Sequence, residues 1–345
     1  MGFRSRGPTF SMPEFLRQAG GCAVVDGGLA TELEANGADL NDPLWSSTCL
    51  ISSPELIRKV HLDYLEAGAN VIISASYQAT IQAFEARGFS IEESEALMCK
   101  SVKIACEARD IFQKSSLNDQ YSVGSDETNL RKHPILVAAS IGSYGAYLAD
   151  GSEYRGDYGK EVTLETLKDF HRRRLQVLAE SGADLITFET IPNKVEAQAY
   201  VELLKENGIR VPAWFSFSGK DEYSVVSGDS IVDCVSVINA CENVVAIGIN
   251  CTPPRYIHGL ILSIRKTTEK PIVVYPNSGE LYDADKKEWV VSTGTSDEDF
   301  ISYVGKWREA GASLIGGCCR TTPRTIRAIA EVLSNAQPVP EEALP

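Results

Sequence analysis

The sequence lacks any stretch that would carry the chain into or across a membrane. It contains no run of 18 apolar residues, so we expect no transmembrane helix. Its first 20 residues contain three arginines but no apolar run of seven or more, so we expect no secretory signal. We therefore expect a soluble cytoplasmic protein, in a reducing compartment where disulfides are uncommon.

Positive charge is also scarce. The chain has 33 Lys and Arg against 47 Asp and Glu, which gives a net charge of −14. Nucleic-acid binding needs a basic surface that neutralises phosphates, so neither a nucleic-acid partner nor a membrane partner is expected. The 43% hydrophobic and 23% charged residues are an ordinary balance for a globular protein.

A short repeated pattern indicates the architecture. Residues 66–72, 180–186 and 309–315 share the pattern E-[AS]-G-A-x-[VL]-I. In each copy a helical pattern runs up to the glycine, which can take the left-handed conformation that ends a helix. The apolar run that follows is typical of a buried parallel strand. The same helix-to-strand joint therefore occurs three times.

Eight such strand candidates alternate with helical patterns along the chain. They are residues 22–26, 70–74, 135–140, 184–189, 213–217, 244–250, 272–275 and 313–317. This alternation predicts an α/β fold, a single-domain (β/α)₈ barrel spanning 1–345 with its core at about 15–335. An open doubly wound sheet is the alternative, and no G-x-G-x-x-G follows the first strand to support it.

The nine cysteines are odd in number and cannot all pair. We expect six to pack in the core: Cys22, Cys49, Cys99, Cys106, Cys234 and Cys241. Four of them form two pairs spaced seven apart on helical patterns, which puts both members of each pair on one helix face.

The other three cysteines lie at strand ends. Cys251 ends the sixth strand, and Cys318 and Cys319 end the eighth. Because both strands neighbour the seventh in a barrel, the three thiolates can converge, and Zn²⁺ is the natural ion to hold them. Three protein ligands leave a fourth position open, as in catalytic zinc sites. A buried cysteine pair without metal is the alternative.

Two acids occupy similar positions at strand ends. Asp26 precedes Gly27 and Gly28 after the first strand, and Glu189 ends the fourth. Such carboxylates can bind an ammonium group, and the backbone N–H groups of a Gly-Gly turn can bind a carboxylate. A helix N-cap for Asp26 and a solvated loop acid for Glu189 are the alternatives. No histidine falls at a strand end, which disfavours a histidine base.

One segment looks inserted on the same face of the barrel. Residues 142–162 follow the third strand and contain four tyrosines. A lid over the site and an ordinary solvated loop both fit this composition.

Taken together, these motifs resemble those of zinc-dependent homocysteine S-methyltransferases. The resemblance rests on D-G-G at 26–28, N-C at 250–251 and G-G-C-C at 316–319, and it extends over about residues 15–335. It is strongest to the plant and bacterial enzymes that use S-methylmethionine as methyl donor. The fold of that family is a (β/α)₈ barrel, in agreement with the strand pattern.

The resemblance implies a role for each motif residue. The three strand-end cysteines would hold one zinc ion per chain. Asp26 and Glu189 would bind the amino group of homocysteine, and the two glycines after Asp26 its carboxylate. Tyr77 would lie near the metal, and Trp45 near the donor.

The implied reaction transfers a methyl group from S-methylmethionine, with S-adenosylmethionine as a second candidate donor, to the homocysteine thiolate. No catalytic residue beyond the zinc site is implied. A selenocysteine or selenohomocysteine methyltransferase is the alternative within the class. A zinc-dependent barrel hydrolase and an inactive zinc or amino-acid sensor are alternatives outside it.

The chain also departs from some members of this family. At 345 residues it has no room for folate or cobalamin modules. It lacks the longer C-terminal segment of betaine-using relatives, which serves oligomerisation. We therefore expect a monomer that does not use betaine.

Overall fold

The computed structural model describes residues 10–42, 44–122, 134–283, 288–290 and 297–335. Its eight parallel strands are β1 (Ala23–Val24), β2 (Val71–Ile73), β3 (Leu136–Gly142), β4 (Leu185–Ile191), β5 (Ala213–Phe217), β6 (Val244–Asn250), β7 (Ile272–Tyr275) and β10 (Ala312–Ile315). Their order is β1-β10-β7-β6-β5-β4-β3-β2, and a parallel bridge between Val25 and Val71 joins the two edges into a barrel. The predicted (β/α)₈ fold is confirmed, with the bounds of β5, β6 and β7 as expected.

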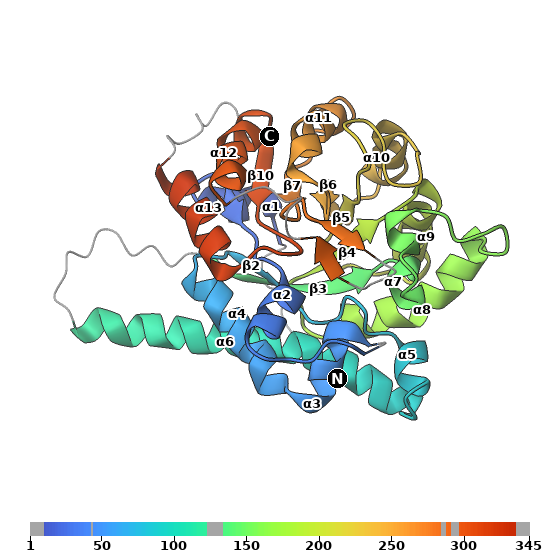
Figure 1. Cartoon of the computed structure of the whole chain (residues 1–345), viewed down its shortest axis with the longest axis horizontal. Helices are drawn as coiled ribbons and strands as arrows, with labels where there is room; N and C mark the ends of the chain where they lie inside the picture. The colour runs from blue at the N-terminus through green and yellow to red at the C-terminus, as the bar shows by residue number, and fades with distance from the viewer. Residues whose placement is uncertain (1–9, 43, 123–133, 284–287, 291–296, 336–345) are drawn as a thin grey trace.

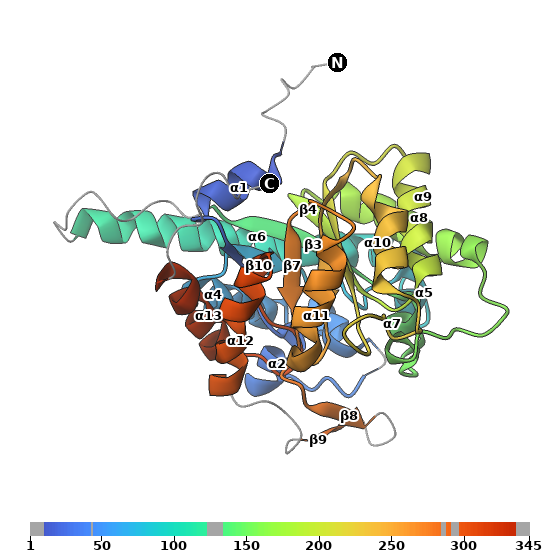
Figure 2. The same cartoon turned by 90° about the horizontal axis from the view of Figure 1, so that it is seen from above.

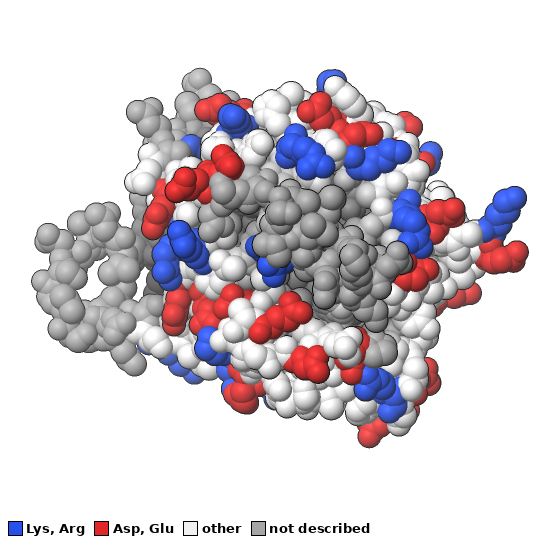
Figure 3. Space-filling view, viewed as in Figure 1, with Lys and Arg blue, Asp and Glu red and all other residues white. Residues whose placement is uncertain are grey.

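Helices surround the barrel (Figure 1). They are α2 (Leu29–Ala35), α3 (Cys49–Ser52), α4 (Pro54–Glu66), α5 (Ile81–Glu85), α6 (Ile91–Ser122), α7 (Tyr144–Leu148), α8 (Leu164–Ala179), α9 (Lys194–Glu206), α10 (Ile231–Asn239), α11 (Pro254–Arg265), α12 (Asp297–Glu309) and α13 (Pro323–Asn335). Within the described ranges, no helix is both long enough and apolar enough to cross a bilayer. On the face seen in Figure 3, acidic and basic side chains are interspersed.

The repeated joint folds as its sequence predicts. Gly68, Gly182 and Gly311 have φ values of +102°, +90° and +113° and follow the ends of α4, α8 and α12. This backbone conformation strains any residue with a Cβ, so glycine lets the chain leave each helix and enter the next strand.

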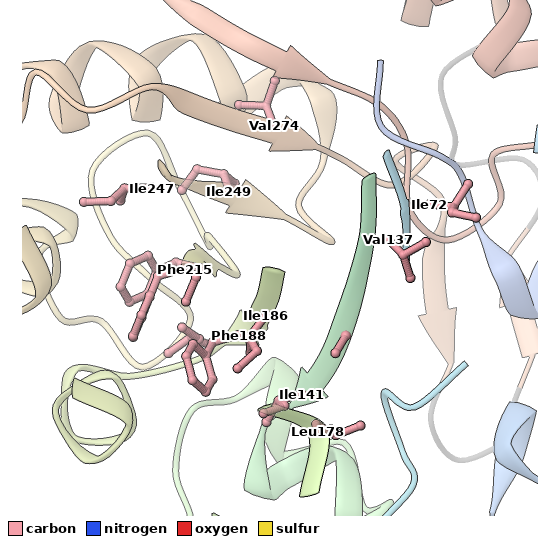
Figure 4. Close-up of a cluster of buried hydrophobic side chains, with 14 of the residues drawn as sticks. Ile72, Val137, Ile141, Leu178, Ile186, Phe188, Phe215, Ile247, Ile249 and Val274 are labelled. Atoms are coloured by element: carbon pink, nitrogen blue, oxygen red, sulfur yellow. The ribbon is translucent and has the colours of Figure 1, made fainter. Parts of the chain in front are cut away.

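Apolar side chains fill two layers. Strand residues such as Ile186, Phe215 and Val274 point outward and pack with the helices in the larger core (Figure 4). Their neighbours Leu185 and Val273 belong to a second, smaller core inside the barrel. This alternation follows from the two-residue period of a strand, which sends successive side chains to opposite faces.

A short helix closes one end of the barrel. The helix α1 (Met12–Gln18) buries Met12, Phe15 and Leu16 against the inner core. Figure 2 shows α1 at the end where the strands begin, with α2 at the opposite end. The sequence analysis did not foresee this helix, nor the antiparallel hairpin of β8 (Leu281–Asp283) and β9 (Glu288–Val290).

Candidate functional site

Three thiols meet where the strands of the barrel end. Cys251 directly follows β6, and two glycines separate β10 from Cys318 and Cys319. The Sγ of Cys251 lies 3.7 Å from that of Cys319, and the Sγ atoms of Cys318 and Cys319 are 3.9 Å apart. All three lie within 4.8 Å of one another and form the one candidate metal-binding cluster found in the described part of the chain.

The donor set fits a soft divalent cation. Tetrahedral zinc with Zn–S bonds of about 2.3 Å holds its sulfur ligands about 3.8 Å apart, close to the distances observed. The Cys251 thiol and burial together raise the pKa of Cys318 well above its usual range. Three thiolates packed this closely repel one another, so the cluster binds a cation more readily than it holds three bare charges.

All nine residues predicted for the site line a single cavity of about 360 Å³. They are Asp26, Gly27, Gly28, Trp45, Tyr77, Glu189, Cys251, Cys318 and Cys319. The cavity opens at the ends of the strands, which is where (β/α)₈ barrels hold their active sites. The structure therefore brings the predicted residues together.

Asp26 is buried and 3% exposed. Its Oδ2 accepts a hydrogen bond of 2.8 Å from the Ile73 N–H, which ties β1 to β2. The N-cap of α2 is Gly28, so the N-cap alternative for Asp26 does not hold. Burial raises the pKa of Asp26 well above its ordinary value, and the nearby Glu189 carboxylate adds to this.

Glu189 is also buried, at 6% exposure, so it is not a solvated loop acid. The Ser140 hydroxyl donates a hydrogen bond to Oε1, and the Tyr275 hydroxyl donates one of 3.1 Å to Oε2. Burial nevertheless raises the pKa of Glu189 to about 7. A carboxylate held this way has a strong affinity for a cationic partner, because such a partner offsets the cost of burying its charge.

The two glycines after Asp26 permit a close approach of backbones. A Cβ on Gly28 would lie 2.6 Å from the Cys318 carbonyl oxygen, and one on Gly27 would lie 2.8 Å from the Tyr64 ring. The Gly28 N–H donates to the carbonyl and hydroxyl oxygens of Thr321, at 3.3 and 3.2 Å. Glycine is thus required here for the first strand end to pack against the cysteine loop.

The two predicted aromatic residues occupy the wall of the cavity. Trp45 opens the 3₁₀ helix η1 (Trp45–Thr48) and is half-buried, with a φ of +48° that is strained for a side chain of its size. The Tyr77 carbonyl accepts a hydrogen bond of 2.6 Å from the buried Arg174 guanidinium. Burial raises the pKa of the Tyr77 hydroxyl, so it stays protonated.

Glu153 and Tyr154 are site residues that the sequence analysis did not single out. Both belong to the 142–162 segment, in the 3₁₀ helix η2 (Ser152–Tyr154), and both line the cavity. The Tyr154 hydroxyl lies 3.8 Å from the Cys251 Sγ. Glu153 is 9% exposed, burial raises its pKa to about 7, and no described residue hydrogen-bonds its Oε2. The four tyrosines in the segment were a signal, but their spacing did not reveal which one reaches the thiols.

Strained backbone is concentrated at the same place. Thr190 and Cys251 have φ values of +57° and +47°. Asn250 stabilises this geometry, because its side chain accepts from the Thr190 N–H at 2.7 Å and donates to the Thr190 hydroxyl at 2.8 Å. Such conformations cost roughly 1–3 kcal/mol each and persist where surrounding contacts fix them, which is common at functional sites.

The remaining six cysteines lie away from the cavity. Four are buried and two, Cys99 and Cys106, are half-buried, and all six pack in or against the outer core. None of the nine cysteines, all of which lie in the described ranges, is in a disulfide. The division of the cysteines into core residues and site residues matches their placement in the structure.

Comparisons with known proteins agree on one family. A family model described as homocysteine S-methyltransferase matches residues 23–333. Homocysteine S-methyltransferase 2 of Arabidopsis thaliana is 68% identical, over 94% of this chain and 97% of its own length. Selenocysteine Se-methyltransferase of Brassica oleracea var. italica is 67% identical, over 93% and 91%. The metallated form of the Escherichia coli homocysteine methyltransferase MmuM superposes with a TM-score of 0.76 at 42% identity, over 90% of this chain and 96% of that one.

Proposed function

The chain belongs to the homocysteine S-methyltransferase family, and on this premise we propose that it transfers a methyl group from S-methylmethionine to the thiol of homocysteine, forming methionine. One observation carries the proposal: three thiols within 4.8 Å of one another face a cavity at the strand ends of a barrel. The enzyme is a methyltransferase, so the hydrolase and sensor alternatives are not retained.

We propose that Cys251, Cys318 and Cys319 hold one Zn²⁺ per chain. The sulfur spacing of 3.7–3.9 Å and the all-thiol donor set support zinc. When bound, zinc would offer its open position to the substrate thiol and lower that thiol's pKa, which makes it a nucleophile at neutral pH. Neighbouring thiols can be oxidised to a disulfide, and we propose that the protein acts in a reducing compartment such as the cytoplasm.

Asp26 and Glu189 are proposed to bind the ammonium group of homocysteine. Their buried carboxyl groups flank the cavity with raised pKa values, so an incoming cation favours their ionised forms. The backbone of Gly27 and Gly28 is proposed to bind the substrate carboxylate, which would replace Thr321 as acceptor for the Gly28 N–H.

Glu153 supports a site for a second positive charge. Its Oε2 is buried without a hydrogen bond from any described residue, on the wall of the cavity that also carries Tyr154. The methyl donor is a sulfonium with its own ammonium group, and carboxylates and aromatic faces both attract such cations. Trp45 and Tyr77 complete this wall, and together these residues would align the methyl carbon with the attacking sulfur and exclude water.

Selenol acceptors form a second candidate function. Two relatives, from Brassica oleracea var. italica and Astragalus bisulcatus, are named as selenocysteine methyltransferases and are 67% and 62% identical to this chain. A selenol binds a soft metal as a thiol does, so the same site can serve both acceptors.

A donor and acceptor comparison tests the proposal. The purified zinc-loaded protein is given homocysteine with S-methylmethionine, S-adenosylmethionine or betaine, and methionine is measured. We expect the highest kcat/KM with S-methylmethionine and no product with betaine. Selenocysteine with S-methylmethionine tests the second function. No methionine from any donor would overturn the main proposal.

A further inference from the structure

The first turn of α9 lies behind the loop that carries Glu153 and Tyr154. We call residues 143–158 the tyrosine loop. The Glu196 side chain is fully buried there, and its Oε1 accepts a hydrogen bond of 2.6 Å from the Tyr144 N–H. Its Oε2 accepts one of 2.6 Å from the Tyr158 hydroxyl. One carboxylate therefore holds both ends of the loop.

Residues outside the tyrosine loop also contact the Glu196 carboxylate. The His171 Nε2 on α8 lies 2.9 Å from Oε1, and the Tyr200 hydroxyl on α9 donates to the same oxygen at 3.2 Å. Two helices of the scaffold thus fix the carboxylate. A buried charge with this many hydrogen-bonding partners has little freedom to move, so it can act as a rigid anchor.

A second side chain of the same turn reaches the loop. Asn193 is the N-cap of α9, and its Oδ1 accepts from the Glu196 N–H at 2.8 Å. Its Nδ2 donates to the Gly156 carbonyl at 3.3 Å. The loop contacts at 144, 156 and 158 lie on both sides of Glu153 and Tyr154 in the sequence.

The packing within the loop transmits this anchoring to the site. A Cβ on Gly145 would lie 2.4 Å from the backbone nitrogen of Glu153. The segment next to the Tyr144 anchor therefore packs directly against the residue that lines the cavity. Moving Tyr144 away from Glu196 would release Glu153 as well.

We propose that Glu196 and Asn193 form a clamp that positions Tyr154 beside the thiols and Glu153 on the cavity wall. Glu196 is a positioning residue, because it contacts the loop and lies on the outer side of the barrel rather than in the cavity. The tyrosine loop is thereby a fixed wall of the site and not a solvated insertion. The consequence for turnover rests on the proposed methyl transfer, whereas the clamp itself does not.

The test compares two variants of the zinc-loaded full chain with a matched control. Glu196→Gln replaces one acceptor oxygen by an NH₂ group, which cannot accept from both Tyr144 and Tyr158. Asn193→Ser keeps a capping oxygen but loses the donor to Gly156. Glu202→Gln makes the same charge change six residues further along α9, where the side chain pairs with Lys168. Hydrogen–deuterium exchange of the 143–158 peptides reports the loop directly.

We expect loop exchange to rise about tenfold in Glu196→Gln and about threefold in Asn193→Ser, with no change in Glu202→Gln. We also expect kcat/KM to fall about tenfold in Glu196→Gln while one zinc per chain is retained. Loop exchange equal to that of Glu202→Gln in both variants would overturn the clamp. If Glu196→Gln does not fold, Asn193→Ser decides alone. An inactive wild type would refute the proposed function and leave the exchange result valid.

Discussion

The two ends of the barrel are built from the same eight strands, but their interiors differ. Apolar side chains fill one end, and the other end holds the cavity with its acids and thiols. Strand β4 shows the change within one chain segment, because Leu185, Thr187 and Glu189 are spaced by two and point to the same face. Leu185 packs in the apolar inner core, and the Thr187 hydroxyl lies 3.3 Å from that of Tyr275. Glu189 lines the cavity. Leu185 in the apolar core and Glu189 in the cavity wall are therefore only four residues apart on one strand.

This difference between the two ends indicates which of them contributes to the stability of the fold. At the closed end, Phe15 and Leu16 of α1 fill the barrel and remove apolar surface from water. At the open end, Asp26 and Glu189 are buried with raised pKa values, and Cys251 has a strained backbone. We conclude that the closed end stabilises the fold and the open end is kept in a costly state, which the proposed substrates would relieve.

Replacing a thiol should have the largest effect and should be confined to the open end. We expect Cys318→Ser to lose zinc and to lower kcat/KM by roughly 10³-fold. That fall corresponds to several kcal/mol of lost transition-state stabilisation. Metal analysis and the methionine assay measure both. Cys106→Ser, in the half-buried core group, is the matched control and should keep metal and activity. Full zinc retention in Cys318→Ser would contradict the ligand assignment.

Truncation at the closed end should show the reverse pattern. Phe15→Ala removes a ring that is 4% exposed, and we expect it to lower the free energy of unfolding by about 3 kcal/mol. Urea denaturation measures this loss. Because the ring lies at the opposite end from the cavity, kcat and KM should stay within about twofold at 25 °C. A large rise in KM with unchanged stability would show that the two ends are not separable.

Neutralising an acid at the open end should stabilise the protein while it weakens substrate binding. The folded-state pKa of Glu189 is about 7, above its ordinary 4.5, so the folded protein binds the proton more tightly than the unfolded chain. This group therefore lowers stability as pH rises from about 4.5 through 7.

The variant Glu189→Gln removes that titration. We expect it to be more stable than wild type by up to about 3 kcal/mol at pH 8 and nearly equal to it at pH 4, as measured by urea denaturation. Its KM for homocysteine should rise at least tenfold, because the proposed ammonium contact loses its charge. A variant whose free energy of unfolding equals that of wild type at both pH values would contradict the raised pKa.

Much of the fold was readable from local patterns. Apolar runs, three of them after glycines that end helices, located all eight strands to within two residues at both ends. The helix α1 escaped prediction because its three buried side chains carry no signal that they plug a barrel. The β8–β9 hairpin escaped because each of its strands has only three residues, too few to show an alternating pattern.

The sequence by itself determined which side chains stand at strand ends, and in a barrel all such ends share one rim. For that reason Asp26, Glu189 and the three cysteines could be named in advance. Only the tertiary structure decided which loop reaches them, since Tyr154 and Cys251 are 97 residues apart and meet at 3.8 Å. Only it revealed that Glu196 holds that loop from behind the barrel. Strand ends follow from a local period, whereas the path of a loop depends on distant side chains that bind it, and no local pattern encodes them.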